Sequence, residues 1–96
     1  MKTETIIEAV CDWFDVTPDK LVIKSRKREY VVARQVSMYF LKQYTTMSLR
    51  KIGETFGGRD HTTAIHSVRT VQWLMDSYES FTDDIKAIEL KINNQK

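Results

Sequence analysis

Apolar residues recur at intervals of three and four along most of this chain, the spacing that places them on one face of an α-helix. Five stretches show this pattern. Their apolar positions are Ile6, Ile7, Val10, Cys11 and Phe14; Val32, Ala33, Val36, Phe40, Leu41 and Tyr44; Leu49, Ile52 and Phe56; Ala64, Val68, Val71 and Met75; and Phe81, Ile85, Ile88 and Ile92. Only three Gly and one Pro interrupt them, so the sequence predicts an all-α fold with short loops.

Capping residues and proline indicate where several helices begin. Thr3 is a candidate N-cap for the first helix. Pro18 stands at the first position of a short helix, where its missing N–H costs nothing. Residues 21–23, which are Leu-Val-Ile, are expected to close the gap between this short helix and the core. The last helix is expected to begin at a cap supplied by Ser80 or Thr82.

A glycine turn joins two of the predicted helices. Ser48 is a candidate N-cap for a short helix that ends at the glycine pair of residues 57–58, because glycine adopts positive φ without a steric penalty. Inside this helix, Gly53 is expected to face a second helix that crosses closely. Asp60 can cap the next, longer helix. Together these features predict a helix-turn-helix over about residues 48–78.

The start of the longer helix carries side chains that can read base pairs. Asp60 can accept from the amino group of cytosine, and His61 can donate to a base or a phosphate. Thr62 and Thr63 can hydrogen-bond through their hydroxyls or contact a thymine methyl. The same residues also fit a capped turn that only faces solvent, and the turn by itself does not separate the two interpretations.

Length and composition indicate one folded domain. A chain of 96 residues, 42% hydrophobic and 29% charged, is typical of a single globular unit over residues 1–96. Cys11 is the only cysteine, which excludes an internal disulfide, and it is expected to be a small buried residue. No apolar run approaches the ~20 residues that cross a bilayer, and the first residues do not resemble a secretory signal. We therefore expect a cytoplasmic protein that does not bind membranes.

The formal net charge of +2 hides an uneven distribution. Residues 1–23 carry two Lys against five acidic residues, for a net charge of −3, and residues 70–96 carry three Lys against five, for −2. Residues 24–69 carry ten Lys or Arg against three acidic residues, for a net charge of +7. A positive field concentrated in the middle of the chain favours a polyanionic partner.

The densest positive cluster is KSRKR at residues 24–28, on a predicted loop. A run of this kind is often only a solvated face, but it can also neutralise phosphates and insert an arginine into the minor groove. In the helix that follows, Arg34, Gln35 and Lys42 lie off the apolar stripe and can approach a phosphate backbone.

Three blocks of this sequence resemble the C-terminal DNA-binding domain of the bacterial DnaA replication initiators. They are GGRDHTTAIH at residues 57–66, ARQVSMY at residues 33–39 and SLRKIG at residues 48–53. The likeness runs from about residue 5 to residue 92. It implies an all-helical domain akin to Trp repressor, with a helix-turn-helix that binds a short asymmetric duplex site, the DnaA box. A monomer is enough for an asymmetric site.

The resemblance also implies individual roles. Base contacts in the major groove fall to Asp60, His61 and Thr62, and a minor-groove contact falls to Arg26. Thr63 and Arg59 would help at the bases and at phosphates. The other expected contacts, at the DNA backbone or its edge, are Arg34, Gln35, Lys42, Leu49, Arg50 and Arg69.

Two positions depart from the family pattern. Arg50 stands where the family often has Pro, and Thr70 stands where a Lys commonly follows the arginine matched by Arg69. The first change adds a candidate phosphate contact and the second removes one, so they affect the affinity more than the type of target. No Gly-Lys-Ser or Gly-Lys-Thr phosphate loop occurs, so we expect no cofactor in this chain. ATP would belong to a separate ATPase domain if the chain is a fragment of an initiator rather than a stand-alone relative.

Other functional classes are kept as alternatives. A helical adaptor could bind an acidic protein through its basic face, with Trp13 and Trp73 as anchors. A stand-alone relative could regulate transcription. No nucleophile has a base and an orienting group at a recognisable spacing, and His61 and His66, five residues apart with Asp60 next to His61, make a poor metal site. We therefore expect no enzymatic activity, no bound metal and no small-molecule substrate.

Overall fold

The computed structural model describes residues 2–94, which form five α-helices and one short 3-10 helix, with no strand in that range. The elements are α1 (Thr3–Phe14), η1 (Pro18–Leu21), α2 (Arg28–Tyr44), α3 (Leu49–Thr55), α4 (His61–Ser77) and α5 (Glu79–Asn94). The prediction of an all-α fold is confirmed, and so is the short helix that begins at Pro18.

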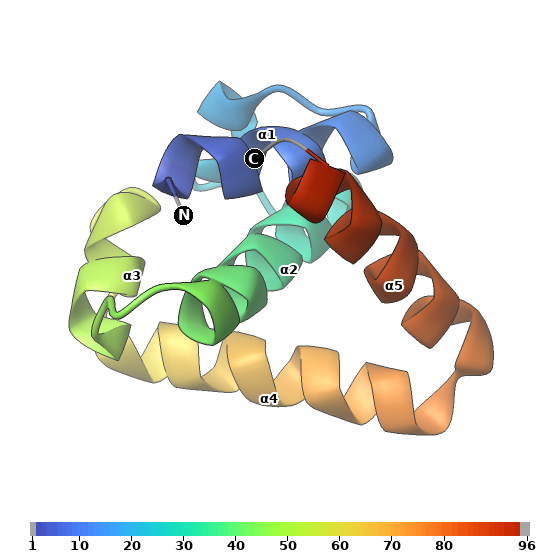
Figure 1. Ribbon diagram of the computed structural model, residues 1–96. Helices are drawn as coiled ribbons and strands as arrows, with labels where there is room; N and C mark the ends of the chain where they lie inside the picture. Colours follow the sequence, from blue (N-terminus) through green and yellow to red (C-terminus); the bar gives the residue numbers. More distant parts are fainter. Residues whose placement is uncertain (1, 95–96) are drawn as a thin grey trace.

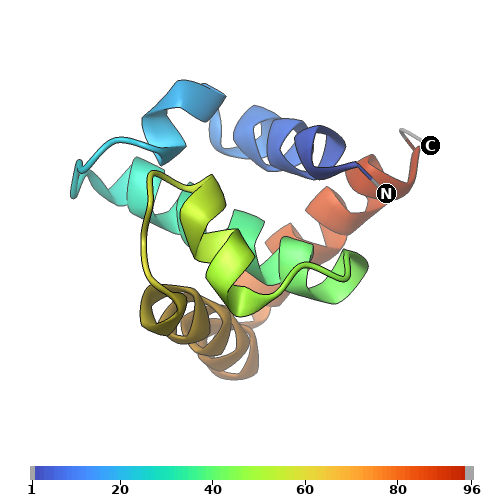
Figure 2. The same ribbon diagram turned by 90° about the vertical axis from the view of Figure 1, so that its left-hand side faces the viewer.

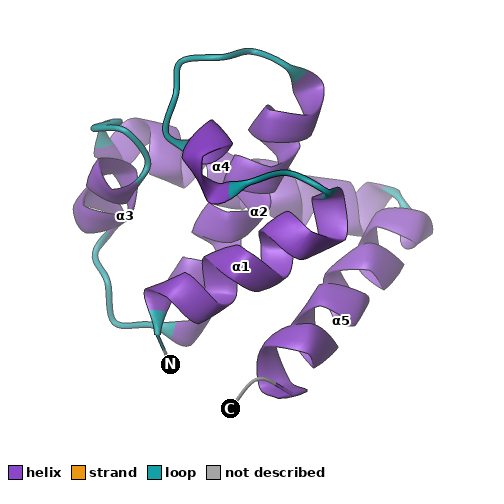
Figure 3. Ribbon diagram, turned by 90° about the horizontal axis from the view of Figure 1, so that it is seen from above, coloured by secondary structure: helices purple, strands orange, loops and turns teal. Residues whose placement is uncertain are grey.

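Helix α2 is the central support of the domain. It packs against α1, η1, α3 and α4. Figure 1 shows α2 between α1 and α4, with α5 returning from the end of α4 toward α1. Figure 3 shows the same arrangement from above, with α1 lying across α2 and α5 alongside α1. Among residues 2–94, no helix combines the length and the apolar character needed to cross a membrane.

The core is built from the apolar stripes that the sequence predicts. Each of the five α-helices contributes residues that are almost completely buried. The almost completely buried apolar residues of the domain are Ile6, Ala9, Val10, Cys11, Leu21, Ala33, Val36, Met38, Phe40, Leu41, Ile52, Phe56, Ala64, Val71, Ile85, Ile88 and Ile92, whereas the predicted position Val68 is only partly buried. Phe14, Tyr44, Leu49, Met75 and Phe81 are partly buried and pack against this core. The positions that hold the helices together therefore follow from the 3.6-residue period.

The hydroxyls predicted as caps do not cap the first and last helices, because both helices begin at or before these residues, so both predictions are wrong. Thr3 lies inside the first turn of α1, and its hydroxyl donates to the sulfur of Met47 at 3.6 Å. Helix α5 begins before both Ser80 and Thr82. The hydroxyl of Thr82 donates at 2.7 Å to the carbonyl of Met75, near the end of α4. These hydroxyls join different elements because each lies beside a polar group of a neighbouring segment.

Cys11 lies on the buried face of α1, as expected. Burial, followed by the carboxylates of Asp12, Asp19 and Glu8, raises the pKa of its thiol to about 11. The thiolate is therefore disfavoured at neutral pH, and the residue contributes to packing rather than to chemistry.

A hydrogen bond between α2 and α5 predicts a loss of stability at alkaline pH. The hydroxyl of Tyr44 donates to Oε2 of Glu89 at 2.5 Å, and burial together with this bond raises the pKa of Tyr44 from 10.0 to about 12. The unfolded chain releases the tyrosine proton near pH 10, so the stability due to this group is present below that pH and is lost as the pH rises to about 12. Tyr44→Phe should remove about 1–2 kcal/mol at neutral pH. Urea unfolding at pH 7 and pH 11 should give a smaller difference for the variant than for the unsubstituted protein.

Candidate nucleic-acid interface

The turn between α3 and α4 has the geometry that the sequence predicts. Gly57 and Gly58 have φ angles of 79° and 74°, in the left-handed region that favours glycine. The hydroxyl of Ser48 accepts from the N–H of Lys51 and caps α3. A carboxylate oxygen of Asp60 accepts from the N–H of Thr63 at 3.1 Å and caps α4. The helix-turn-helix is therefore confirmed, with both of its helices capped by side chains.

Gly53 allows the backbone of the turn to lie directly against α3. A Cβ atom at this position would overlap the carbonyl oxygens of Arg59 and Asp60. The carbonyl of Gly53 also accepts from the N–H of Arg59 at 3.0 Å. The sequence predicts a close approach here, but the approaching segment is the turn rather than the crossing helix that we expected. This contact fixes the start of α4 relative to α3.

The candidate base-reading side chains lie in solvent at the start of α4. Asp60, His61, Thr62 and Thr63 are all exposed. The first N–H groups of a helix have no partners within the helix and carry the positive end of its dipole, so this end attracts anions. Asp60 uses one carboxylate oxygen for the cap, and its second oxygen remains available as an acceptor.

A second exposed segment lies beside this turn. Residues 22–27, which we call the basic loop, connect η1 to α2 and carry Arg26, which is exposed. Figure 2 shows the basic loop and the turn before α4 on the same side of the molecule. Nη2 of Arg59 donates to the carbonyl of Ile23 at 2.9 Å, and Nη1 of Arg59 donates to the carbonyl of Phe56. A Cβ atom at Gly57 would overlap the carbonyl oxygen of Val22, so the two segments are in direct contact.

Arg34 is placed differently from the prediction. We expected its side chain to lie off the buried stripe of α2, near a phosphate backbone, but it is only 8% exposed. Its Nε donates to the carbonyl of Leu21 at 3.0 Å, and its Nη2 lies 3.4 Å from the carbonyl oxygens of Ile23 and Ser25. Burial, and to a smaller extent the charge of Arg59, lowers the pKa of Arg34. The buried guanidinium of Arg34 therefore holds the backbone of the basic loop through its carbonyl oxygens.

Two of the three residues expected to close the core do not do so. Leu21 is completely buried, but Val22 and Ile23 are 43% and 42% exposed. The physical reason is that the carbonyl oxygens of residues 21 and 23 face the arginines, which turns the chain outward after Leu21. The basic loop is therefore held by hydrogen bonds of its backbone more than by its side chains.

The other predicted contacts are distributed over the three helices of this region. Lys42 on α2, Arg50 on α3 and Arg69 on α4 are exposed, whereas Gln35 is partly buried. Nε of Arg50 lies 3.6 Å from a carboxylate oxygen of Glu54 on the next turn of α3. Leu49 packs against the core, so part of its apolar side chain is buried in the protein. Within residues 2–94, no group of three or more His, Cys, Asp or Glu side chains is placed to hold a metal ion.

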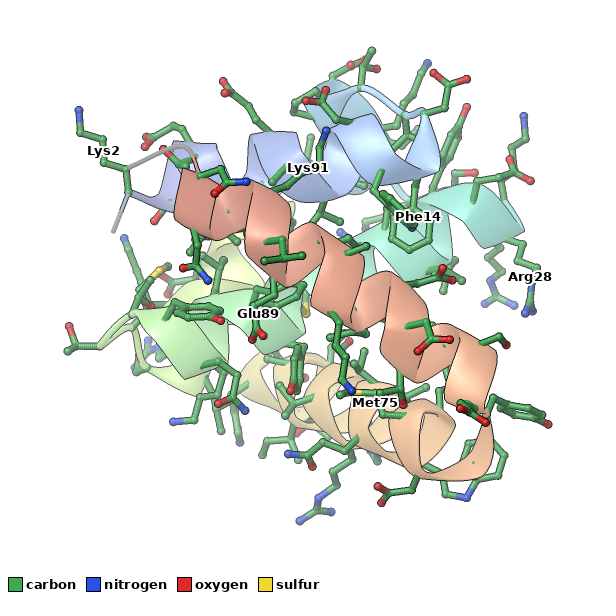
Figure 4. All side chains as sticks on the ribbon, turned by 45° about the vertical axis from the view of Figure 1, so that its right-hand side comes forward. Lys2, Phe14, Arg28, Met75, Glu89 and Lys91 are labelled. Atoms are coloured by element: carbon green, nitrogen blue, oxygen red, sulfur yellow. The ribbon has the colours of Figure 1, made fainter. Side chains whose placement is uncertain are left out.

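Two exposed aromatic residues, Trp73 and Tyr78, lie at the opposite end of α4, and a third, Trp13, is 42% exposed on α1. Trp73 is 60% exposed, and its ring contacts that of Tyr78 edge to face, with a centroid distance of 6.1 Å. Both residues border an open hollow of about 560 Å³ that Phe14 and Arg28 also line. Figure 4 shows Phe14 and Arg28 on the side of the molecule where α4 passes into α5. Trp73 follows His61 by twelve residues, about 18 Å along the helix axis, so the hollow lies away from the start of α4, although Arg28, the residue after the basic loop, lines it.

Comparison with known proteins identifies the family of this domain. A family model described as the bacterial DnaA protein helix-turn-helix matches residues 3–71. The chain belongs to this DnaA family. The match includes the basic loop, α2, α3, the turn and the first eleven residues of α4.

Curated relatives of the DnaA family agree with this assignment. The chromosomal replication initiator protein DnaA of Corynebacterium jeikeium is 38% identical over 89 residues, which are 93% of this chain and 15% of that protein. The protein of the same name from Bacteroides thetaiotaomicron is 41% identical over 86 residues, which are 90% of this chain and 18% of the relative. That of Chlorobaculum tepidum is 49% identical over 69 residues, which are 72% of this chain and 14% of the relative. The chain thus spans less than a fifth of the length of these three initiators, and the resemblance to the DnaA C-terminal domain is confirmed.

Proposed function

We propose that this DnaA-family domain binds double-stranded DNA in a sequence-specific manner, at sites like the DnaA box, in the recognition of a replication origin. The observation that supports this proposal best is the contact between the turn before α4 and the basic loop, where Nη2 of Arg59 donates to the carbonyl of Ile23. The segment that carries the exposed Asp60, His61 and Thr62 is therefore a neighbour of the loop that carries the exposed Arg26. We further propose that the start of α4 enters the major groove while the basic loop enters the adjacent minor groove.

The proposed role of α4 follows from the chemistry of its first turn. The free carboxylate oxygen of Asp60 can accept from the amino group of cytosine, while His61 and Thr62 can donate to acceptors on base edges. A recognition helix uses the residues at its N-terminus in this way. Thr63 and the N–H groups at the helix start would add phosphate contacts.

Phosphate contacts are proposed to supply most of the affinity. Residues 24–69 have a net charge of +7, and Arg26, Lys42, Arg50 and Arg69 are exposed within this range. Each phosphate neutralised by one of these side chains would release counterions and make binding more sensitive to salt. Gln35 can contribute a neutral hydrogen bond to the DNA backbone.

DNA binding of this kind requires few partners. One copy of the domain is enough for an asymmetric duplex site, and neither a cofactor nor a small-molecule substrate is required for binding. The relatives named above are replication initiators, and we propose that this chain serves in the same process. A stand-alone regulator of transcription would use the same DNA-binding surface.

A binding titration tests the proposal. Fluorescence anisotropy should be measured with a labelled DnaA-box duplex and with a scrambled duplex of the same composition, at 50 mM and 200 mM salt. We expect tighter binding to the box at both salt concentrations and a steep fall in affinity for both duplexes as salt rises. Equal affinity for the two duplexes would rule out sequence-specific binding. Weak binding that hardly depends on salt would instead favour an acidic protein as the partner.

Lys42→Ala should weaken binding to all duplexes alike. The ammonium group of Lys42 is exposed near the end of α2, so we expect a phosphate contact and no base contact. Its loss should reduce the affinity for the box and for the scrambled duplex by the same factor, and should lower the slope of log K against log salt by about one unit. A change in the ratio of the two affinities would show that Lys42 takes part in sequence discrimination.

A further inference from the structure

The carbonyl oxygen of Ile23 is a point where three segments of the domain meet. It accepts from Nη2 of Arg59, in the turn before α4, at 2.9 Å. It also lies 3.4 Å from Nη2 of Arg34, which belongs to α2. The second terminal nitrogen of Arg59 donates to the carbonyl of Phe56 within its own turn. The guanidinium of Arg59 therefore bridges the turn and the basic loop, with both terminal nitrogens donating to backbone carbonyls.

The basic loop has little else to hold it in this position. Between Leu21, which is buried, and the start of α2, only Ser25 is even partly buried. The side chains of Val22 and Ile23 are exposed, so apolar packing contributes little to the position of the loop. The hydroxyl of Ser25 accepts from the N–H of Lys27, but this bond is internal to the loop. Gly57 lies close to the carbonyl of Val22, and the exposed Lys27 contacts Glu29 and the ring of Tyr30 on α2. The side-chain hydrogen bonds that link the loop to the rest of the domain come from Arg34 and Arg59.

We propose that Arg59 is a positioning residue that joins the basic loop to the helix-turn-helix, so that the minor-groove and major-groove elements bind as one rigid unit. This inference rests on the proposed function and changes the role of Arg59 from a direct phosphate contact to an internal bridge. Arg34 supports the same carbonyl from below, where it is almost fully buried. Fixing the loop before binding removes the entropic cost of ordering it on DNA, which increases the benefit from Arg26.

The substitution Arg59→Lys distinguishes a bridging role of the Arg59 side chain from a role of its positive charge at a phosphate. Lysine keeps the positive charge, so it preserves a phosphate contact, but a single ammonium group cannot reproduce the planar fork that spans two carbonyls. If Arg59 is a bridge, Arg59→Lys should behave like Arg59→Ala. If Arg59 is a phosphate contact, Arg59→Lys should behave like the unsubstituted protein.

The first measurement needs no DNA. Backbone ¹⁵N relaxation of the free domain reports the mobility of the amides in residues 22–27. We expect Arg59→Lys and Arg59→Ala both to increase this mobility, whereas Arg50→Lys, a control on the exposed side of α3, should leave it unchanged. Circular dichroism should show the helical content of the unsubstituted protein in all three variants. Unchanged mobility of the loop in both Arg59 variants would overturn the proposal, whatever the domain binds.

The second measurement is a double-mutant cycle on box DNA. With Arg59 present, Arg26→Ala should reduce the preference for the box over the scrambled duplex by about 10-fold. In the Arg59→Lys protein the same substitution should reduce this preference by less than about 3-fold, because a mobile loop positions Arg26 poorly. The slope of log K against log salt should be the same for the unsubstituted protein and for Arg59→Ala. An undiminished effect of Arg26→Ala, or a salt slope lowered by about one unit in Arg59→Ala, would identify Arg59 as a phosphate contact instead.

The two proposals fail in different ways. If the unsubstituted protein binds the box and the scrambled duplex equally, the proposed function fails, but the relaxation measurement still decides whether Arg59 holds the loop. If discrimination is present and the cycle shows no coupling, the proposed function stands and the bridge has no role in it.

Discussion

Gly53→Ala is expected to lower the free energy of unfolding by about 3 kcal/mol. A methyl group at this position would overlap the carbonyl oxygens of Arg59 and Asp60, and neither backbone oxygen can move without displacing the turn. The gain in helix propensity from alanine, about 1 kcal/mol, offsets only part of this cost. The same displacement should move the cap of α4, so binding to box DNA should weaken as well. Urea unfolding followed by circular dichroism measures the effect.

The other two glycines of the chain separate steric overlap from backbone strain. At Gly58 an added Cβ atom meets nothing within 4 Å, so alanine there has only the cost of positive φ, about 1 kcal/mol. Gly57→Ala combines a φ of 79° with an overlap on the carbonyl of Val22, and it should resemble Gly53→Ala in its cost while also displacing the basic loop. If Gly58→Ala lowered the free energy of unfolding as much as Gly53→Ala, the cost of positive φ would be as large as the cost of steric overlap, which would contradict this explanation.

His61→Ala is expected to lower the discrimination between the box and a single-base variant by about 1–3 kcal/mol, roughly 5- to 150-fold. His61 is the first residue of α4 and is exposed, so alanine should remove the proposed base contact without disturbing the core. Titrations against a set of duplexes that each carry one changed base pair would locate the loss at one or two positions.

His66→Ala is the matched control for this prediction. His66 is also exposed on α4 but follows His61 by five residues, beyond the first turn. Its replacement should change the affinity for all duplexes by a similar small factor. An equal loss on box and scrambled duplexes for His61→Ala would contradict its role in base recognition.

The fold could be predicted from the sequence because its main signals are local. The apolar stripes with a period of 3.6 residues became the core, and Ser48 and Asp60 became side-chain caps. The glycine pair before α4 adopted positive φ at both positions. Each of these features depends on residues within one or two helical turns, where spacing along the chain determines spacing in space.

The roles of the arginines could not be predicted in the same way. An arginine in a basic region is a candidate phosphate contact, but its partners depend on the path of segments far away in the sequence. Arg34 bonds to carbonyls 9 to 13 residues away, and Arg59 bonds to one that is 36 residues away. Backbone carbonyls carry no sequence signal, so the sequence could not distinguish Arg59 from the exposed Arg26. The same limitation explains why Val22 and Ile23 were expected in the core.

The most direct test of DNA recognition by these two elements is a ¹⁵N chemical-shift titration of the domain with box DNA. We expect the amides of residues 22–27 and of residues 60–63 to shift most and to saturate together at the same DNA concentration, while those around Trp73 and Tyr78 hardly change. Shifts concentrated around the hollow at the far end of α4, or shifts in only one of the two predicted segments, would contradict it.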